Sequence, residues 1–156
     1  IIKDYKIHFN NVKHDKASET EQVMKKNMIK IIKKVLNWFE TNNKISWLIT
    51  ILIAIFIFYM SSKTFPPEIP GVNYLSYVYH FGIYLVFGFF LLISITKGRL
   101  NKKYLFFIAM LIAIGYGISD EIHQFFVPGR YCAIPDALTD SIGSLMAGIV
   151  YVLFKK

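Results

Sequence analysis

Four long apolar runs limit what this chain can fold into more than any other feature of the sequence. Each run is close to the roughly 20 residues that an α-helix needs to cross the hydrocarbon core of a bilayer. A soluble domain of 156 residues has no core that can bury a chain with 54% hydrophobic residues. Because a helix satisfies its own backbone hydrogen bonds in lipid, the sequence predicts an all-α membrane protein. The four membrane spans are predicted at residues 45–61, 75–96, 104–126 and 136–154.

The connections between the predicted spans are short, and the sequence shows no repeat and no second transmembrane domain. Helices joined by short loops run antiparallel to their neighbours. We therefore expect residues 44–156 to form a compact bundle of four transmembrane helices. Residues 1–43 form a polar and basic N-terminal segment. Its first 22 residues have no clear hydrophobic period, and we expect the segment to be partly disordered.

The second half of the N-terminal segment has a helical pattern. From Met24, a candidate natural start of the chain, lysines are interspersed with apolar residues at helical spacing. This pattern is typical of a basic amphipathic helix on an anionic membrane surface. A solvated helix that leads into the first span explains the pattern equally well. The apolar positions are Ile29, Ile32, Leu36 and Phe39, and the lysines are Lys25, Lys26, Lys30, Lys33 and Lys34.

Basic residues gather in three places: before the first span, in the loop at 97–103 and at the C-terminus. The loops at 62–74 and 127–135 contain only Lys63 and Arg130 as basic residues. By the positive-inside rule, both termini and the 97–103 loop are predicted to be cytoplasmic, in a multi-pass protein of the cell membrane. This distribution also accounts for the net charge of +8. Since no basic patch carries a recognisable nucleic-acid-binding motif, we expect no nucleic-acid partner.

Three of the predicted spans and one loop carry polar side chains at the level of the predicted outer surface. In the span at 104–126, these residues share one side of the helix, opposite Ile118, Ile122 and Phe125. In the span at 136–154, acids and small residues form one stripe, and the small residues favour close helix packing. Ionisable groups are costly inside a membrane, so we expect them to face protein or water. The polar residues at this level are His80, Tyr84, Asp120, Glu121, His123, Gln124, Arg130, Asp136 and Asp140.

Single residues of this set also have structural explanations. A lone histidine in a span, such as His80, is more often satisfied by a hydrogen bond between helices than used in catalysis. Asp136 suits the first turn of a helix, where an acid stabilises the helix dipole. Arg130 suits an anchor to lipid headgroups. We favour a functional site for the set as a whole, because its members converge at one level on one side of the membrane.

The residues DEIHQ, the turn PGR and an Asp that opens the last span together resemble the signature of the VanZ-like family of small membrane proteins. In this chain they are residues 120–124, residues 128–130 and Asp136. A His-Phe pair at 80–81, followed by Tyr84, is similar to a second hallmark of the family. The first combination is specific, whereas the second is weak by itself.

The resemblance covers residues 44–154 and departs from the family pattern in two places. The family usually has an Asn where this chain has Asp140, and it often has an Asp-Lys pair shortly before the histidine, which this chain lacks. The family's name comes from a protein associated with resistance to the glycopeptide antibiotic teicoplanin. The resemblance therefore implies a membrane architecture and a site in the cell envelope, rather than a reaction.

An enzyme at the outer leaflet, acting on a lipid headgroup or a lipid-linked cell-envelope intermediate, is the first hypothesis for this site. Crowded carboxylates and a histidine supply acid and base groups, and an arginine suits a phosphate or carboxylate. The predicted catalytic residues are Asp120, Glu121, His123 and His80. The predicted binding residues are Gln124, Arg130, Asp136, Asp140 and Tyr84.

The sequence contains no nucleophile elbow, glycine-rich phosphate loop or HExxH motif, so covalent and zinc-protease schemes have no support. A divalent metal is compatible with the ligand types that are present, although their spacing is not diagnostic. The candidate ligands are Asp120, Glu121, His123, Asp136 and Asp140. The sequence specifies neither a cofactor nor an oligomeric state.

Two other classes of function fit the same residues. A non-enzymatic protein binds an envelope lipid, or an antibiotic bound to that lipid, without chemistry. A structural subunit pairs its acids with an arginine of another chain inside the membrane. A transporter fits less well, because the polar residues stop at one side of the membrane. Membrane lipids are the expected partners in each case.

Overall fold

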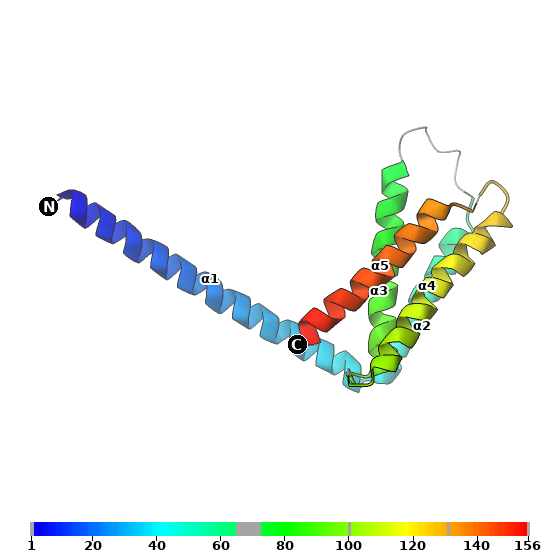
Figure 1. Ribbon diagram of the computed structural model, residues 1–156, viewed down its shortest axis with the longest axis horizontal. Helices are drawn as coiled ribbons and strands as arrows, with labels where there is room; N and C mark the ends of the chain where they lie inside the picture. The colour runs from blue at the N-terminus through cyan, green and yellow to red at the C-terminus, as the bar shows by residue number, and fades with distance from the viewer. Residues whose placement is uncertain (1, 65–72, 100, 131, 156) are drawn as a thin grey trace. The chain divides into compact units, whose positions relative to one another are not determined.

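The computed structural model describes residues 2–64, 73–99, 101–130 and 132–155, with side chains from residue 19 onward apart from residue 73. The described residues form helices and no strands (Figure 1). The helices are α1 (Ile2–Thr41), α2 (Asn43–Ser61), α3 (Asn73–Thr96), α4 (Lys103–Phe125) and α5 (Ile134–Lys155). The predicted all-α class is confirmed.

Four of these helices are long and apolar enough to cross a membrane, with mean hydropathies of 1.6–2.1. They comprise Asn43–Ser61, Tyr74–Thr96, Lys103–Phe125 and Ile134–Lys155. Each bound lies within two residues of the predicted one, so the multi-pass membrane architecture is confirmed. The outward faces carry large apolar side chains such as Leu111 and Phe107, which are 73% and 68% exposed on the protein itself. We expect these faces to contact lipid, because exposure of such area to water is costly.

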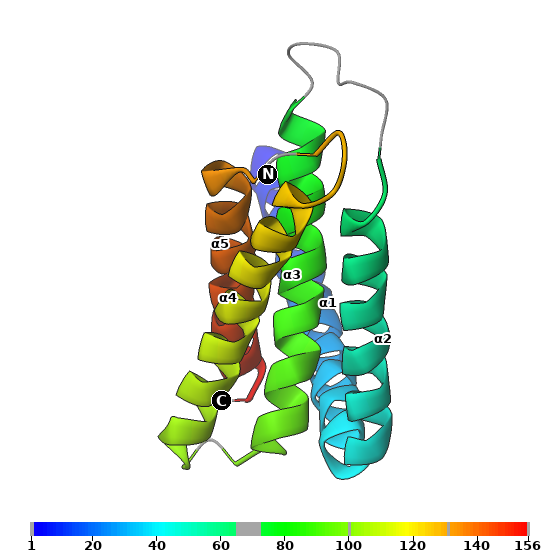
Figure 2. The ribbon, with the colours of Figure 1, turned by 90° about the vertical axis from the view of Figure 1, so that its right-hand side faces the viewer.

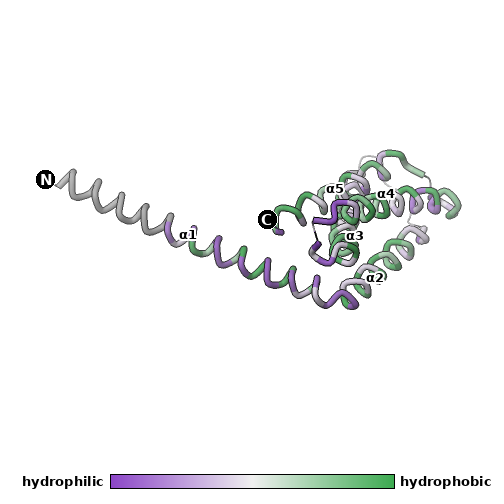
Figure 3. Tube along the Cα trace, turned by 60° about the horizontal axis from the view of Figure 1, so that its bottom comes forward, coloured by the Kyte–Doolittle hydropathy of each residue, from purple (hydrophilic) through white to green (hydrophobic). Residues whose placement is uncertain are grey.

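The chain divides into two units, residues 1–36 and residues 37–156. Helix α1 covers the segment from Met24, where the sequence predicts a helix, and it also covers residues 2–22. Polar and apolar residues alternate along the coloured part of α1 in Figure 3. The expected partial disorder of the N-terminal segment, and its boundary after residue 43, stay predictions.

Helices α2 to α5 form the bundle of the second unit, with α3 in its centre (Figure 2). Helix α3 packs against α2, α4 and α5, and its contact with α5 is the most extensive. Successive helices run in opposite directions. The end of α2, the start of α3, the end of α4 and the start of α5 therefore lie together, at what we call the site end. The opposite end, with the 97–103 loop and Lys155, is called the basic end.

Small residues bring α3 and α5 close together. A methyl group at Gly143 on α5 would lie 2.5 Å from the backbone oxygen of Phe81 on α3. One at Gly88 on α3 would lie 3.3 Å from the Cβ atom of Ala147 on α5. Backbones approach this closely only where no side chain stands between them. The small residues of α5 therefore determine how near its acids come to α3.

Buried polar groups at the basic end are paired with one another. The hydroxyl of Tyr151 on α5 donates a hydrogen bond of 2.9 Å to Oε1 of Glu40 and lies 2.8 Å from the hydroxyl of Thr96 on α3. The ammonium group of Lys155 forms an ion pair with the other oxygen of Glu40. Glu40 belongs to the last turn of α1, so this network ties the entry of the bundle to α3 and α5. Its groups satisfy one another, as buried polar groups require.

Candidate functional site

A histidine on α3 and an aspartate on α5 form the central contact of the site end. Nδ1 of His80 lies 2.9 Å from Oδ1 of Asp140, and the two residues are 5% and 0% exposed. Since an ionised carboxylate only accepts hydrogen bonds, we assign the ring proton to Nδ1, which donates it to Asp140. His80 therefore makes a hydrogen bond between helices, as expected for a histidine with a structural role in a membrane span. The same bond fixes the direction in which its second nitrogen, Nε2, points.

Asp136, one turn before Asp140 on α5, faces that second nitrogen. Its Oδ2 lies 3.9 Å from Nε2 of His80. The spacing of four residues places both acids on one face of α5. The side chain of Asp136 is 18% exposed, so it stands between the buried pair of His80 and Asp140 and the surface of the bundle.

Glu121 enters the site end from α4 and is 1% exposed. Its Oε2 accepts a hydrogen bond of 3.0 Å from the backbone N–H of Ala133, and its Oε1 accepts one of 3.0 Å from the amide of Gln124. Ala133 belongs to the loop between α4 and α5. Glu121 therefore anchors that loop over the site end, and two donors hold its own carboxylate in place.

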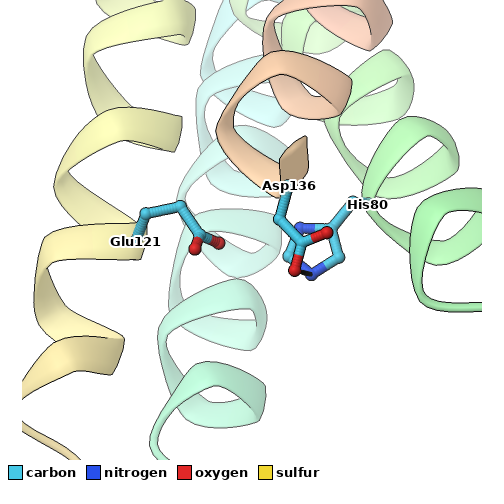
Figure 4. A group of neighbouring side chains, drawn as sticks. All are labelled: His80, Glu121 and Asp136. Atoms are coloured by element: carbon cyan, nitrogen blue, oxygen red, sulfur yellow. Dashed lines mark ion pairs between the residues drawn. The ribbon is translucent and has the colours of Figure 1, made fainter. Parts of the chain in front are cut away.

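His80, Glu121 and Asp136 point toward one another from three different helices (Figure 4). One ligand-type atom from each of them lies within 4.8 Å of the others. We call these three residues the triad. The metal-ligand set predicted from the sequence shares Glu121 and Asp136 with the triad, but sequence reasoning placed His80 among the acid–base residues only. The predicted ligands Asp120, His123 and Asp140 are not members of the triad.

Asp120 is buried beside a serine of α2 that sequence reasoning did not include. The hydroxyl of Ser61 donates a hydrogen bond to Oδ1 of Asp120, and the amide of Gln124 donates one of 3.2 Å to Oδ2. Gln124 therefore links Asp120 to Glu121. The signal for Ser61 in the sequence is a pair of hydroxyl residues where the first span ends, at the level of the acids.

Tyr84 lies one turn after His80 on α3, farther from the site end and toward the middle of the bundle. Its hydroxyl and Oδ2 of Asp140 are buried, and neither has a hydrogen-bond partner among the described residues. A methyl group at Gly117 on α4 would lie 2.9 Å from Cβ of Asp140 and 3.2 Å from the ring of Tyr84. Gly117 therefore lets α4 approach this pair. The unpaired oxygens of these two residues, which both adjoin Gly117, leave hydrogen-bonding capacity for a water or a ligand.

His123 lies apart from the triad and faces α2. Its Nε2 is 3.0 Å from the hydroxyl of Ser62, and its ring stacks on Phe58 with 4.6 Å between the centroids. On a helical wheel, a residue three positions later lies about 60° to one side of the first residue, and the next residue lies about 100° to the other side. His123 therefore falls beside Asp120 on the side away from Glu121, at the edge of the polar face. Its catalytic role stays a prediction.

Arg130 lies in the loop between α4 and α5 and is half-buried. It interacts electrostatically with Tyr79 at the start of α3, as Asp120 and Asp140 do. The loop therefore carries its positive charge to the same end of the bundle as the acids. The predicted binding role of Arg130 is compatible with this position and stays a prediction.

Fold and site together define a class: a multi-pass, all-α membrane protein whose helices share a buried polar cluster at one end. The family model described as VanZ/LLP1 matches residues 7–155. The chain therefore belongs to the VanZ/LLP1 family, as its signature residues imply. The match begins well before residue 44, so the family pattern also includes most of the N-terminal segment that the resemblance left out. No curated protein and no solved structure matches the chain.

Proposed function

We propose that this protein acts at the outer surface of the cell membrane on a phosphate-bearing lipid headgroup or a lipid-linked cell-envelope intermediate. The proposed reaction is hydrolysis of the headgroup or its transfer. The observation that carries the proposal is the buried cluster in which His80 and carboxylates from α4 and α5 meet at one end of the bundle. Membership of a family linked by name to teicoplanin resistance supports a role in the cell envelope.

The orientation is part of the proposal. We assign the site end to the outside because basic residues of the loops collect at the basic end, and such residues are retained on the cytoplasmic side. The basic residues after α3, at the start of α4 and at the end of α5 are Lys97, Arg99, Lys102, Lys103 and Lys155. A site at the outer ends of the helices lies at the depth where an envelope lipid presents its headgroup, with its chains in the hydrocarbon core.

The cluster contains the kinds of group that hydrolysis of a phosphate ester needs. A carboxylate accepts a proton from the attacking water as the bond between the water oxygen and phosphorus forms. The bond between phosphorus and the leaving oxygen breaks, and that oxygen takes up the proton that the carboxylate accepted. In a transfer reaction, an acceptor hydroxyl takes the place of water. Arg130, in the loop over the site end, is suited to hold two phosphate oxygens at once.

Phosphate release by the purified protein in mild detergent tests the catalytic proposal, with isoprenyl diphosphates and phospholipids as substrates. The wild-type protein is expected to release phosphate from at least one of them. Glu121→Gln is expected to lower the rate by at least about 100-fold, because it removes an acid–base or ligand group. Ser119→Ala, on the exposed side of the same helix, is the matched control and should keep the wild-type rate. Hydrolysis is ruled out if the wild-type protein releases no phosphate, and a catalytic role of Glu121 is ruled out if Glu121→Gln keeps the full rate.

Binding without chemistry is the second candidate function, and one observation favours it. Both carboxylate oxygens of Glu121 already accept hydrogen bonds from the protein, which is also what a purely structural or binding role requires. In this case, mass spectrometry should find a lipid that co-purifies with the wild-type protein and with Glu121→Gln but is lost from Arg130→Ala. A stoichiometric protein partner that is lost on Asp140→Ala would instead favour a structural subunit.

A further inference from the structure

We infer that the site end binds one divalent transition-metal ion through Nε2 of His80, a carboxylate oxygen of Glu121 and a carboxylate oxygen of Asp136. The three residues come from α3, α4 and α5, and one ligand-type atom of each lies within 4.8 Å of those of the other two (Figure 4). Nε2 is the nitrogen of His80 that faces Asp136. The inference deepens the proposed function and rests on the same cluster. It adds an ion, its ligands and the way in which a phosphate group would be held.

The orientation of His80 is the first argument for a metal. Its Nδ1 donates a hydrogen bond to Asp140, so Nε2 is left to face Asp136. A neutral imidazole would then point a lone pair at a carboxylate, which is unfavourable unless a proton or a metal ion lies between them. Histidines that bind metals commonly donate their other N–H to a carboxylate in this way, which fixes the tautomer and makes the ligand nitrogen more basic.

The spacing of the atoms is the second argument. Bonds from Zn²⁺ to an imidazole nitrogen or a carboxylate oxygen are about 2.0–2.2 Å long, so two such ligands at a tetrahedral angle are about 3.4 Å apart. Nε2 of His80 and Oδ2 of Asp136 are 3.9 Å apart. This distance is too long for a hydrogen bond. Movements of a few tenths of an ångström in each side chain would close the pair around an ion.

The surroundings of the other ligands are the third argument. Glu121 accepts hydrogen bonds from the backbone N–H of Ala133 and from the amide of Gln124, so its carboxylate is held in position while each oxygen keeps a free lone pair. Ligating carboxylates in metal sites are supported by hydrogen bonds of this kind. Glu121 is almost fully buried, and a buried carboxylate is costly unless it is paired or coordinates a metal.

The unpaired oxygens below His80 point to a further component of the site. Oδ2 of Asp140 and the hydroxyl of Tyr84 are both at least nine-tenths buried, and neither has a hydrogen-bond partner among the described residues. Buried oxygens of this kind are usually satisfied by ordered water. A water at this position would complete the hydrogen bonding of the carboxylate that orients the histidine ligand.

The donor set selects the kind of ion. One imidazole and two carboxylates suit Zn²⁺, Co²⁺ or Mn²⁺ better than Ca²⁺ or Mg²⁺, which prefer oxygen ligands alone. Three protein ligands leave at least one coordination position open, as catalytic metal sites do. A phosphate oxygen of the proposed substrate fits that position. His80 is then a metal ligand and not a proton donor, and Asp140 is a positioning residue.

Metal binding by the full-length protein in mild detergent tests the inference. The protein is stripped with EDTA, dialysed, and titrated with Zn²⁺, Mn²⁺ or Co²⁺ alone, and bound metal is measured by mass spectrometry and by the visible absorption of Co²⁺. We expect one ion per chain. His80→Gln, Glu121→Gln and Asp136→Asn should each weaken binding at least about tenfold, because each removes a ligand. Asp140→Asn should retain the ion and shift the Co²⁺ spectrum, because it changes only the environment of the histidine.

Glu40→Gln is the matched control, since it alters a buried carboxylate at the basic end and should leave metal binding unchanged. Size-exclusion profiles and circular dichroism establish folding, and Asp136→Asn, at the most exposed position of the triad, carries the test if another variant does not fold.

The inference is overturned if the wild-type protein binds no ion, or if the three ligand variants bind as tightly as the wild type. Lipid turnover by a wild-type protein that binds no ion would overturn the metal site and leave the proposed function standing. Metal binding without turnover of any lipid would do the reverse.

Discussion

At the scale of single residues, Asp140 shows how packing and chemistry meet in this protein. It lies where α3, α4 and α5 come together, accepts the hydrogen bond of His80, and has room only because α4 carries a glycine at position 117. The family usually has an asparagine at this position. An asparagine oxygen would accept the same hydrogen bond, so the orientation of the histidine does not require a charge. The aspartate of this chain adds a negative charge to a cluster that is already acidic.

The glycines of the bundle give a prediction at the same scale. Gly143→Ala places a methyl group 2.5 Å from the backbone oxygen of Phe81, where no flexible side chain can yield. It should destabilise the protein by about 1–3 kcal/mol, the usual cost of overpacking. Gly115→Ala on α4 has nothing within 4 Å and should be neutral or stabilising by up to about 1 kcal/mol, since alanine favours a helix.

Thermal unfolding in detergent, followed by the fluorescence of Trp38 and Trp47, measures both effects. A lower melting temperature for Gly143→Ala than for Gly115→Ala is the expected order. Equal melting temperatures for the two variants would show that the approach of α3 to α5 is less close than the structure indicates.

At the scale of elements, α1 differs from the other helices. On a helical wheel, one half of its circumference from Met24 to Phe39 is apolar, apart from Lys25, and the other half carries the remaining lysines. Several apolar side chains are exposed on the protein itself, among them Ile31 at 62% and Met28 at 56%. A helix with these two faces suits the boundary between headgroups and acyl chains of an anionic membrane. We therefore propose that this part of α1 lies on the membrane surface, and we favour this interpretation over a solvated helix.

Hydrogen exchange of the full-length protein in lipid nanodiscs checks this proposal. Residues 24–36 should exchange more slowly in nanodiscs with anionic lipid than in zwitterionic ones, because each lysine near the surface contributes about 1 kcal/mol of attraction. Changing Lys26, Lys30, Lys33 and Lys34 together to Gln should abolish the difference, and so should high salt. The matched control changes Lys97 and Lys102 to Gln and should retain it. Equal exchange in both lipids would contradict a membrane-surface helix.

At the scale of the whole molecule, the two ends of the bundle have different polar networks. At the basic end, the carboxylate of Glu40 is neutralised by Lys155 and hydrogen-bonded by Tyr151. At the site end, Asp140 is hydrogen-bonded to His80, and Glu121 accepts hydrogen bonds from the amide of Gln124 and the backbone N–H of Ala133. Such an arrangement suits a structural network at one end of the membrane and a reactive or ligand-binding one at the other. The proposed orientation assigns the second to the outside.

The single cysteine tests this orientation directly. Cys132 is exposed and lies in the loop between α4 and α5 at the site end. A membrane-impermeant maleimide should label it in intact cells, and Cys132→Ser should abolish the labelling. Adding Asn101→Cys to the Cys132→Ser chain moves the thiol to the loop of the basic end, where labelling should require permeabilised cells. The opposite pattern would invert the topology and place the site end in the cytoplasm.

The sequence by itself determined the class of protein, the four spans and the polar faces of α4 and α5. These features depend on local properties: the length of an apolar run decides whether it suits lipid, and the helical period decides which residues share a face. Only the tertiary structure decided which polar groups meet. His80 joins Glu121 and Asp136, whereas His123 turns to α2, and Ser61 enters beside Asp120. Those pairings depend on how each helix is rotated about its axis and how closely the helices approach. Packing between distant parts of the chain sets both.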